Sequence, residues 1–63
     1  MKPNIGDIFV HEQYNETYVC FICKITSYMI FVNIFAEGYI RRNVAFSINE
    51  FNEWIIRYNY IKQ

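Results

Sequence analysis

Along the first three quarters of the chain, the apolar residues fall into short runs rich in β-branched and aromatic side chains, bounded by polar or turn residues, which is typical of β-strands. The predicted strands cover residues 8–11, 17–25, 29–35 and 39–46. Two short polar stretches between them suit turns: residues 13–16, centred on Asn15, and Glu37-Gly38, because glycine accepts a positive φ. Connections this short predict a meander, so we expect an antiparallel sheet.

The period of the apolar residues changes after residue 46. Ser47 to Glu50 reads S-x-x-E, a capping box in which each side chain bonds the other residue's backbone N–H. The residues Phe51, Trp54, Ile55 and Tyr58 follow with the i, i+3, i+4, i+7 spacing of a helical stripe. We therefore expect a helix over residues 48–58, and then a short last strand or a packed tail at residues 60–62.

These elements predict one domain over residues 1–63, mostly β with one C-terminal helix (α+β). The sheet should be small and antiparallel, with four to five strands, and a small SH3-like barrel is the preferred arrangement. Ile40 and Val44 are the expected core residues of the fourth strand.

The least polar stretch, residues 18–35, is about long enough to span a bilayer. Lys24 lies near its middle, at a cost of roughly 2.5–3.5 kcal/mol, and Asn33 adds a second polar group. Residues 26–28 interrupt the stretch with turn-tolerant side chains. We interpret it as two strands, not a membrane segment. Because the first residues, MKPNIGDIF, lack the apolar run of a signal peptide, a cytoplasmic location is expected.

The composition contains more apolar surface than so short a chain is expected to hide. Hydrophobic residues make up 54% of the sequence, aromatic residues 21% and charged residues 19%, with no net charge. Strands 17–25 and 29–35 are apolar on both faces, although one helix covers only one face of a sheet. We therefore predict an exposed partner-binding patch. Its predicted members are Tyr18, Ile22, Met29, Phe31 and Phe35, with Tyr39, Arg41 and Arg42 at its rim. The alternative is a tightly curled barrel whose loops and tail cover this face.

No motif for catalysis or for a cofactor is found. Cys20 and Cys23 form a C-x-x-C, but positions three apart on a strand face opposite sides of the sheet. A metal would need two further ligands, and His11 is the one histidine, expected at the surface of an edge strand. Pockets of about 300–1,000 Å³ are also hard to form in 63 residues. We expect a non-enzyme that binds neither metal nor cofactor.

The predicted function is protein binding. Richness in Ile, Asn, Tyr and Phe suggests an AT-biased genome, so the hypothesis is a phage or mobile-element accessory protein that inhibits or modulates a host protein by steric docking. Homodimerisation through the same patch is a variant of this hypothesis. The alternative is a single-stranded nucleic-acid-binding small barrel, in which aromatic rings stack bases and Lys24, Arg41 or Arg42 contact phosphates. Six basic residues against six acidic ones make that alternative weaker.

Overall fold

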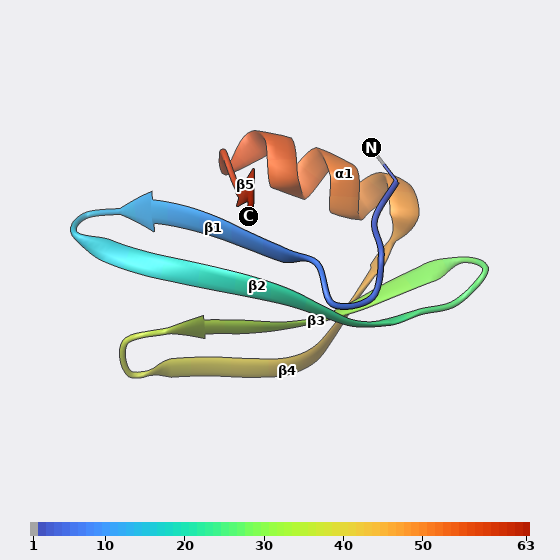
Figure 1. The fold of residues 1–63 in the computed structure, drawn as a ribbon, viewed down its shortest axis with the longest axis horizontal. Coiled ribbons are helices and arrows are strands. Elements are labelled where there is room, and N and C mark those ends of the chain that lie inside the picture. The colour runs from blue at the N-terminus through green and yellow to red at the C-terminus, as the bar shows by residue number, and fades with distance from the viewer. Residues whose placement is uncertain (1) are drawn as a thin grey trace.

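The computed structural model describes residues 2–63, which form five strands and one helix (Figure 1). The elements in chain order are β1 Ile8–Gln13, β2 Glu16–Ile25, β3 Met29–Ala36, β4 Tyr39–Ser47, α1 Ile48–Arg57 and β5 Ile61–Lys62. The predicted fold class is confirmed, and each predicted strand and the helix lies within two residues of its observed bounds. The apolar stretch 18–35 forms most of β2, a turn and most of β3, as the sequence predicted.

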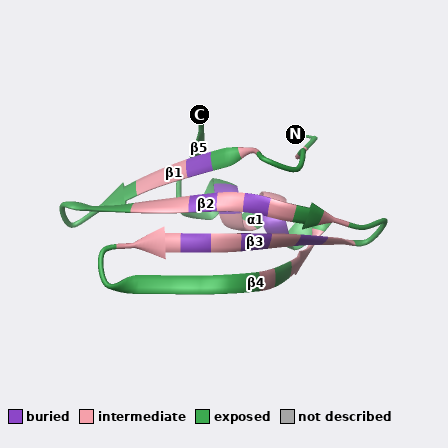
Figure 2. Cartoon of the chain, turned by 60° about the horizontal axis from the view of Figure 1, so that its bottom comes forward, coloured by how far each residue is buried: buried purple, intermediate pink, exposed green. Residues whose placement is uncertain are grey.

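The strands form one antiparallel sheet in the order β4-β3-β2-β1-β5. The sheet stays open, so the SH3-like barrel expected from the sequence does not form. Closure would require β4 to pair with β5. Instead, the chain leaves α1 and returns to the free edge of β1, where β5 pairs through only two residues. Strand β4 remains an edge strand, largely exposed along its length (Figure 2).

Helix α1 begins at the predicted capping box. Ser47 Oγ accepts a hydrogen bond from the Glu50 backbone N–H at 3.2 Å, and Glu50 Oε1 accepts one from the Ser47 N–H at 3.0 Å. The bonds from Ser47 lower the pKa of the Glu50 carboxyl. Asn59 then turns the chain with a φ of +54°, and the N–H of Tyr60 bonds to the carbonyl of Ile55 at 3.0 Å. These contacts fix both ends of α1.

The core lies between α1 and the face of the sheet that α1 covers (Figure 1). Its members are Phe9, Cys20, Ile22, Ile30, Val32, Ile34, Phe51, Ile55 and Tyr60. Phe51 and Ile55 come from the predicted helical stripe. Trp54 packs against the edge of this core, while Tyr58 is 45% exposed. Burial raises the pKa of the Cys20 thiol to about 12.

Two β-bulges change which side chains face the helix. In β2 the pairing shifts between Ile22 and Lys24, so that Ile25 returns to the core side. In β4 it shifts across Asn43, which has a φ of +55°. The prediction for Val44 is correct, since it packs against the core. The prediction for Ile40 is wrong: it pairs with Phe35 on the other face and is 59% exposed, because the bulge breaks the alternation between residues 40 and 44.

Candidate functional site

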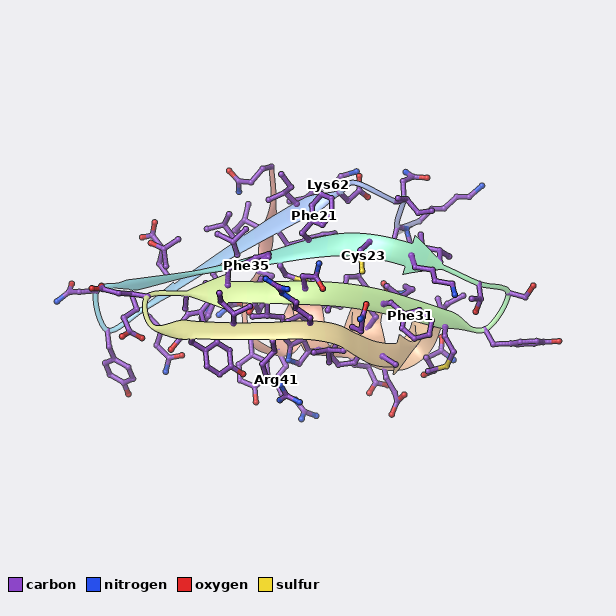
Figure 3. The ribbon with its side chains drawn as sticks, turned by 90° about the horizontal axis from the view of Figure 1, so that it is seen from below. Phe21, Cys23, Phe31, Phe35, Arg41 and Lys62 are labelled. Carbon is purple, nitrogen blue, oxygen red and sulfur yellow. The ribbon has the colours of Figure 1, made fainter. Side chains whose placement is uncertain are left out.

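The face of the sheet opposite α1 is the first candidate site, and we call it the open face. Pairing register and alternation place on it Ile8, Val10, Val19, Phe21, Met29, Phe31, Phe35, Ile40 and Ile61. Figure 3 looks directly onto this face, and no element of residues 2–63 crosses it. Phe21, Phe31 and Phe35 are half-buried, because neighbouring side chains on the sheet partly cover their rings. The open face is therefore a largely apolar surface that no other element of residues 2–63 covers.

Two polar groups in the middle of the open face, the Cys23 thiol and Asn33 Oδ1, are hydrogen-bonded within the sheet. The thiol of Cys23 donates to the carbonyl oxygen of Phe31 at 3.3 Å. Asn33 Oδ1 accepts from the backbone N–H of Asn43 at 3.1 Å. Lys24 Nζ lies 5.4 Å from the centre of the Phe31 ring, at cation–π distance. A partner that covers the Cys23 thiol and Asn33 Oδ1 would therefore not have to supply hydrogen bonds to these two groups.

The eight residues predicted from the sequence do not all lie together. Met29, Phe31 and Phe35 lie on the open face. Ile22 has no exposed surface and belongs to the core, so its assignment to a binding patch is wrong. Alternation along β2 shows that Tyr18 and Ile22 lie on the same face of the sheet. It does not show which residues of β3 lie on that face. The register gives the answer, since Ile22 pairs with the buried Val32.

The predicted rim residues do not border the open face as expected. Tyr39 lies on the helix side, where it lines a groove together with Tyr18, which was predicted to belong to the patch itself. Arg41 pairs with Ile34, and its side chain reaches past the free edge of β4 (Figure 3). Arg42 is exposed in the irregular part of β4. The sequence interpretation missed Val19 and Phe21, which pair with Phe35 and Asn33 and belong to the open face.

A groove on the helix side of the sheet is the second candidate site. Its volume is about 530 Å³, so the expectation that so short a chain forms no sizeable pocket is wrong. We call it the aromatic groove; it is lined by His11, Gln13, Glu16, Tyr18, Ile34, Glu37, Tyr39, Trp54, Tyr58 and Tyr60. It lies where the β1–β2 and β3–β4 hairpins extend beyond the C-terminal end of α1 (Figure 1).

Four rings form a stack along one wall of the aromatic groove. The centroids of Trp54 and Tyr60 are 4.5 Å apart, those of Tyr60 and His11 are 5.2 Å apart, and those of His11 and Tyr18 are 5.9 Å apart. Successive planes differ by only 31–37°. Burial raises the pKa of the Tyr60 phenol to about 12. His11, expected to be a plain surface residue, is thus half-buried within this stack.

The two cysteines and the single histidine do not converge. Cys20 is buried on the helix side and Cys23 lies on the open face, as the strand geometry predicted, and both thiols are free. Within residues 2–63, no group of three potential metal ligands comes together. The same residues include no helix with the length and apolar character needed to cross a membrane.

Comparison of the chain with protein-family models, with curated proteins and with solved structures finds no match. The case for a function therefore comes from the two surfaces of the molecule.

Proposed function

We propose that the protein is a non-enzymatic binding module that docks its open face onto an apolar surface of another protein. The observation that carries this proposal is the apolar open face, which no other part of residues 2–63 covers. Apolar patches of this kind on small proteins usually mark interaction sites.

The residue types on the open face support a protein partner. Phe21, Phe31 and Phe35 are aromatic residues, which are enriched at protein interfaces and which contribute much of the binding energy there. They stand on adjacent antiparallel strands, so their positions are fixed before binding. A rigid surface loses little conformational entropy when it docks.

Charge favours a protein over nucleic acid as the partner. A chain with six basic and six acidic residues has no net charge to attract a polyanion. Among residues 2–63, Lys24 is the one basic side chain at cation–π distance from an aromatic ring, that of Phe31. Single-strand binders combine stacking rings with a basic groove, whereas the aromatic groove of this protein contains Glu16 and Glu37.

The biological setting that we propose is the cytoplasm of a host cell. A phage or mobile-element accessory protein of this size would act sterically, by occupying a surface that a host enzyme or assembly needs. The AT-biased composition supports this origin, and the mechanism requires no chemistry beyond docking.

Matched charge substitutions on opposite sides of the molecule test the proposal. Phe31→Glu places a carboxylate on the open face. Ile56→Glu makes the same change on α1, at a side chain that is 73% exposed. Both variants and the wild type, tagged alike, are used to capture proteins from host lysate, after circular dichroism has shown that each is folded.

We expect a defined host protein to be captured by the wild type and by Ile56→Glu but not by Phe31→Glu. The same partner should cross-link to a photoreactive residue placed at Phe35 and not to one placed at Ile56. Capture that persists in folded Phe31→Glu and Phe21→Glu variants would disprove docking through this face. A wild-type mass of twice 7.7 kDa in light scattering, reduced to 7.7 kDa by Phe31→Glu, would instead identify a second copy as the occupant.

A further inference from the structure

The aromatic groove differs from the open face because its rings are accompanied by negative charge. Rings from β1, β2, β4, α1 and the segment after α1 surround it, and Ile34 contributes an apolar surface. Its volume of about 530 Å³ lies within the range of sites that bind small molecules or single side chains. The proposal below does not rest on the open face.

Negative charge comes to the groove from both hairpins. Glu16 begins β2 and Glu37 lies in the β3–β4 turn, and both side chains line the groove. Glu16 Oε2 accepts a hydrogen bond from the Tyr18 hydroxyl at 2.8 Å, and this bond together with the carboxylate charge raises the pKa of the Tyr18 phenol. Within the described chain, no lysine or arginine lines the groove.

The end of α1 adds to the negative potential. Trp54 and the C-cap residue Tyr58 place the C-terminal end of the helix beside the groove, and this end of a helix attracts cations. Arg57, in the same turn, lies instead in a hollow that it shares with Glu50 and Glu53. The guanidinium of Arg57 therefore does not neutralise the carboxylates of the aromatic groove.

We propose that the aromatic groove is a receptor for an arginine side chain presented by a partner protein. A guanidinium stacks on aromatic faces and pairs with carboxylates through its planar donors. The stack of Trp54, Tyr60, His11 and Tyr18 supplies the rings, and Glu16 and Glu37 supply the carboxylates. The same carboxylates repel phosphate. For a nucleotide, this repulsion would offset the binding energy gained by stacking its base on the rings.

Titration of ¹⁵N-labelled protein with capped tripeptides tests the proposal. The probe is acetyl-Gly-Arg-Gly-amide, and acetyl-Gly-Gln-Gly-amide and acetyl-Gly-Glu-Gly-amide are the neutral and acidic controls. Because the chain has one tryptophan, the indole N–H signal reports on Trp54 without ambiguity. We expect the arginine peptide to shift this signal and the backbone signals of His11 and Tyr60. The glutamine and glutamate peptides should leave them in place.

A pair of double variants separates the local charge from the net charge. Glu16→Gln with Glu37→Gln removes the two groove carboxylates while keeping side-chain size. Glu12→Gln with Glu53→Gln makes the same change in net charge at positions outside the groove. The first double variant should bind the arginine peptide about two- to fivefold more weakly for each lost exposed contact. The second should bind it as the wild type does.

Three results would overturn the proposal. One is equal shifts with the glutamine peptide, which would mean that the groove recognises no charge. Another is stronger binding of the glutamate peptide. The third is an unchanged Trp54 signal up to the solubility limit of the arginine peptide.

Discussion

The ring of Phe9 in β1 meets the ring of Phe51 in α1 edge-to-face, with centroids 5.6 Å apart and an angle of 75° between the planes. Neither side chain has exposed surface. This contact joins β1 to α1, two elements that are far apart in the sequence. The contact holds α1 on one face of the sheet, and the opposite face has no such cover.

Substitution of Phe51 by alanine should therefore remove most of the stability of the protein. A buried Phe→Ala change costs about 3–5 kcal/mol through lost transfer energy and the cavity that remains. A chain of 63 residues has a total stability of only about 3–9 kcal/mol. Urea unfolding followed by Trp54 fluorescence measures the loss. Ile56→Ala, at an exposed position of the same helix, should change the free energy of unfolding by less than about 0.5 kcal/mol.

The capping box should make stability depend on pH through Glu50. Its folded-state pKa is lowered, so the carboxylate stabilises the folded protein above the ordinary value of 4.5, and that stabilisation disappears as the pH falls through the folded value. Glu50→Gln keeps a side chain that fits the box but cannot ionise. We expect this variant to be less stable than the wild type near pH 7, and the difference to disappear at a pH below the folded-state pKa of Glu50.

Urea unfolding at the two pH values measures this difference, and Glu12→Gln on the exposed part of β1 is the control. A gap between wild type and Glu50→Gln that stays constant with pH would contradict the role of the carboxylate. Ser47→Ala removes the other half of the box and should cost about 1 kcal/mol near pH 7.

The two cysteines should differ sharply in reactivity. Cys20 is fully buried and its thiol pKa is raised to about 12, whereas Cys23 is half-buried on the open face. Because the thiolate is the reactive form, a disulfide reagent at pH 8 should modify one thiol per folded molecule. Peptide mapping should place that modification at Cys23. Unfolding in urea should make the second thiol, that of Cys20, accessible to the reagent. Early modification of Cys20 would show that α1 opens more readily than its packing indicates.

Local patterns in the sequence were enough to predict the elements of this fold. Short β-branched and aromatic runs bounded by turn residues located β1 to β4, and the S-x-x-E motif at Ser47 located the start of α1. These signals depend on residues close to each other in the chain. The interactions that form them are short-range, so they can be recognised without knowing the tertiary structure.

The binding surfaces depend on long-range pairing, which alternation does not specify. The pattern grouped Tyr18 with Ile22, but which residues of β3 lie on the same face as these two is set by the pairing register, in which Ile22 lies opposite Val32. For the same reason Phe21 was not recognised as a neighbour of Phe35. The aromatic groove was missed because His11, Tyr18 and Trp54 meet only after β1, β2 and α1 have packed together.

The turn between β1 and β2 offers a route to a more stable protein. Tyr14 and Asn15 form a two-residue connection with φ values of +50° and +64°. Two-residue hairpins that need positive φ at both positions favour Asn-Gly. Tyrosine rarely adopts this conformation, and the Tyr14 side chain is 89% exposed, so its removal sacrifices little packing. Tyr14→Asn with Asn15→Gly should therefore raise stability by about 1 kcal/mol in urea unfolding, because Asn adopts the left-handed conformation at less cost than Tyr.

In the turn between β3 and β4, a substitution at Gly38 should have the opposite effect on stability. Gly38 has a φ of +69°, and a Cβ atom there would contact nothing within 4 Å. Gly38→Ala should thus lower stability by about 1 kcal/mol through backbone conformation alone, without any steric clash. If both substitutions shift the urea midpoint in these opposite directions, the turn conformation explains both. A decrease in stability for the Asn-Gly variant would mean that Tyr14 stabilises the hairpin through contacts of its ring that outweigh its strained backbone.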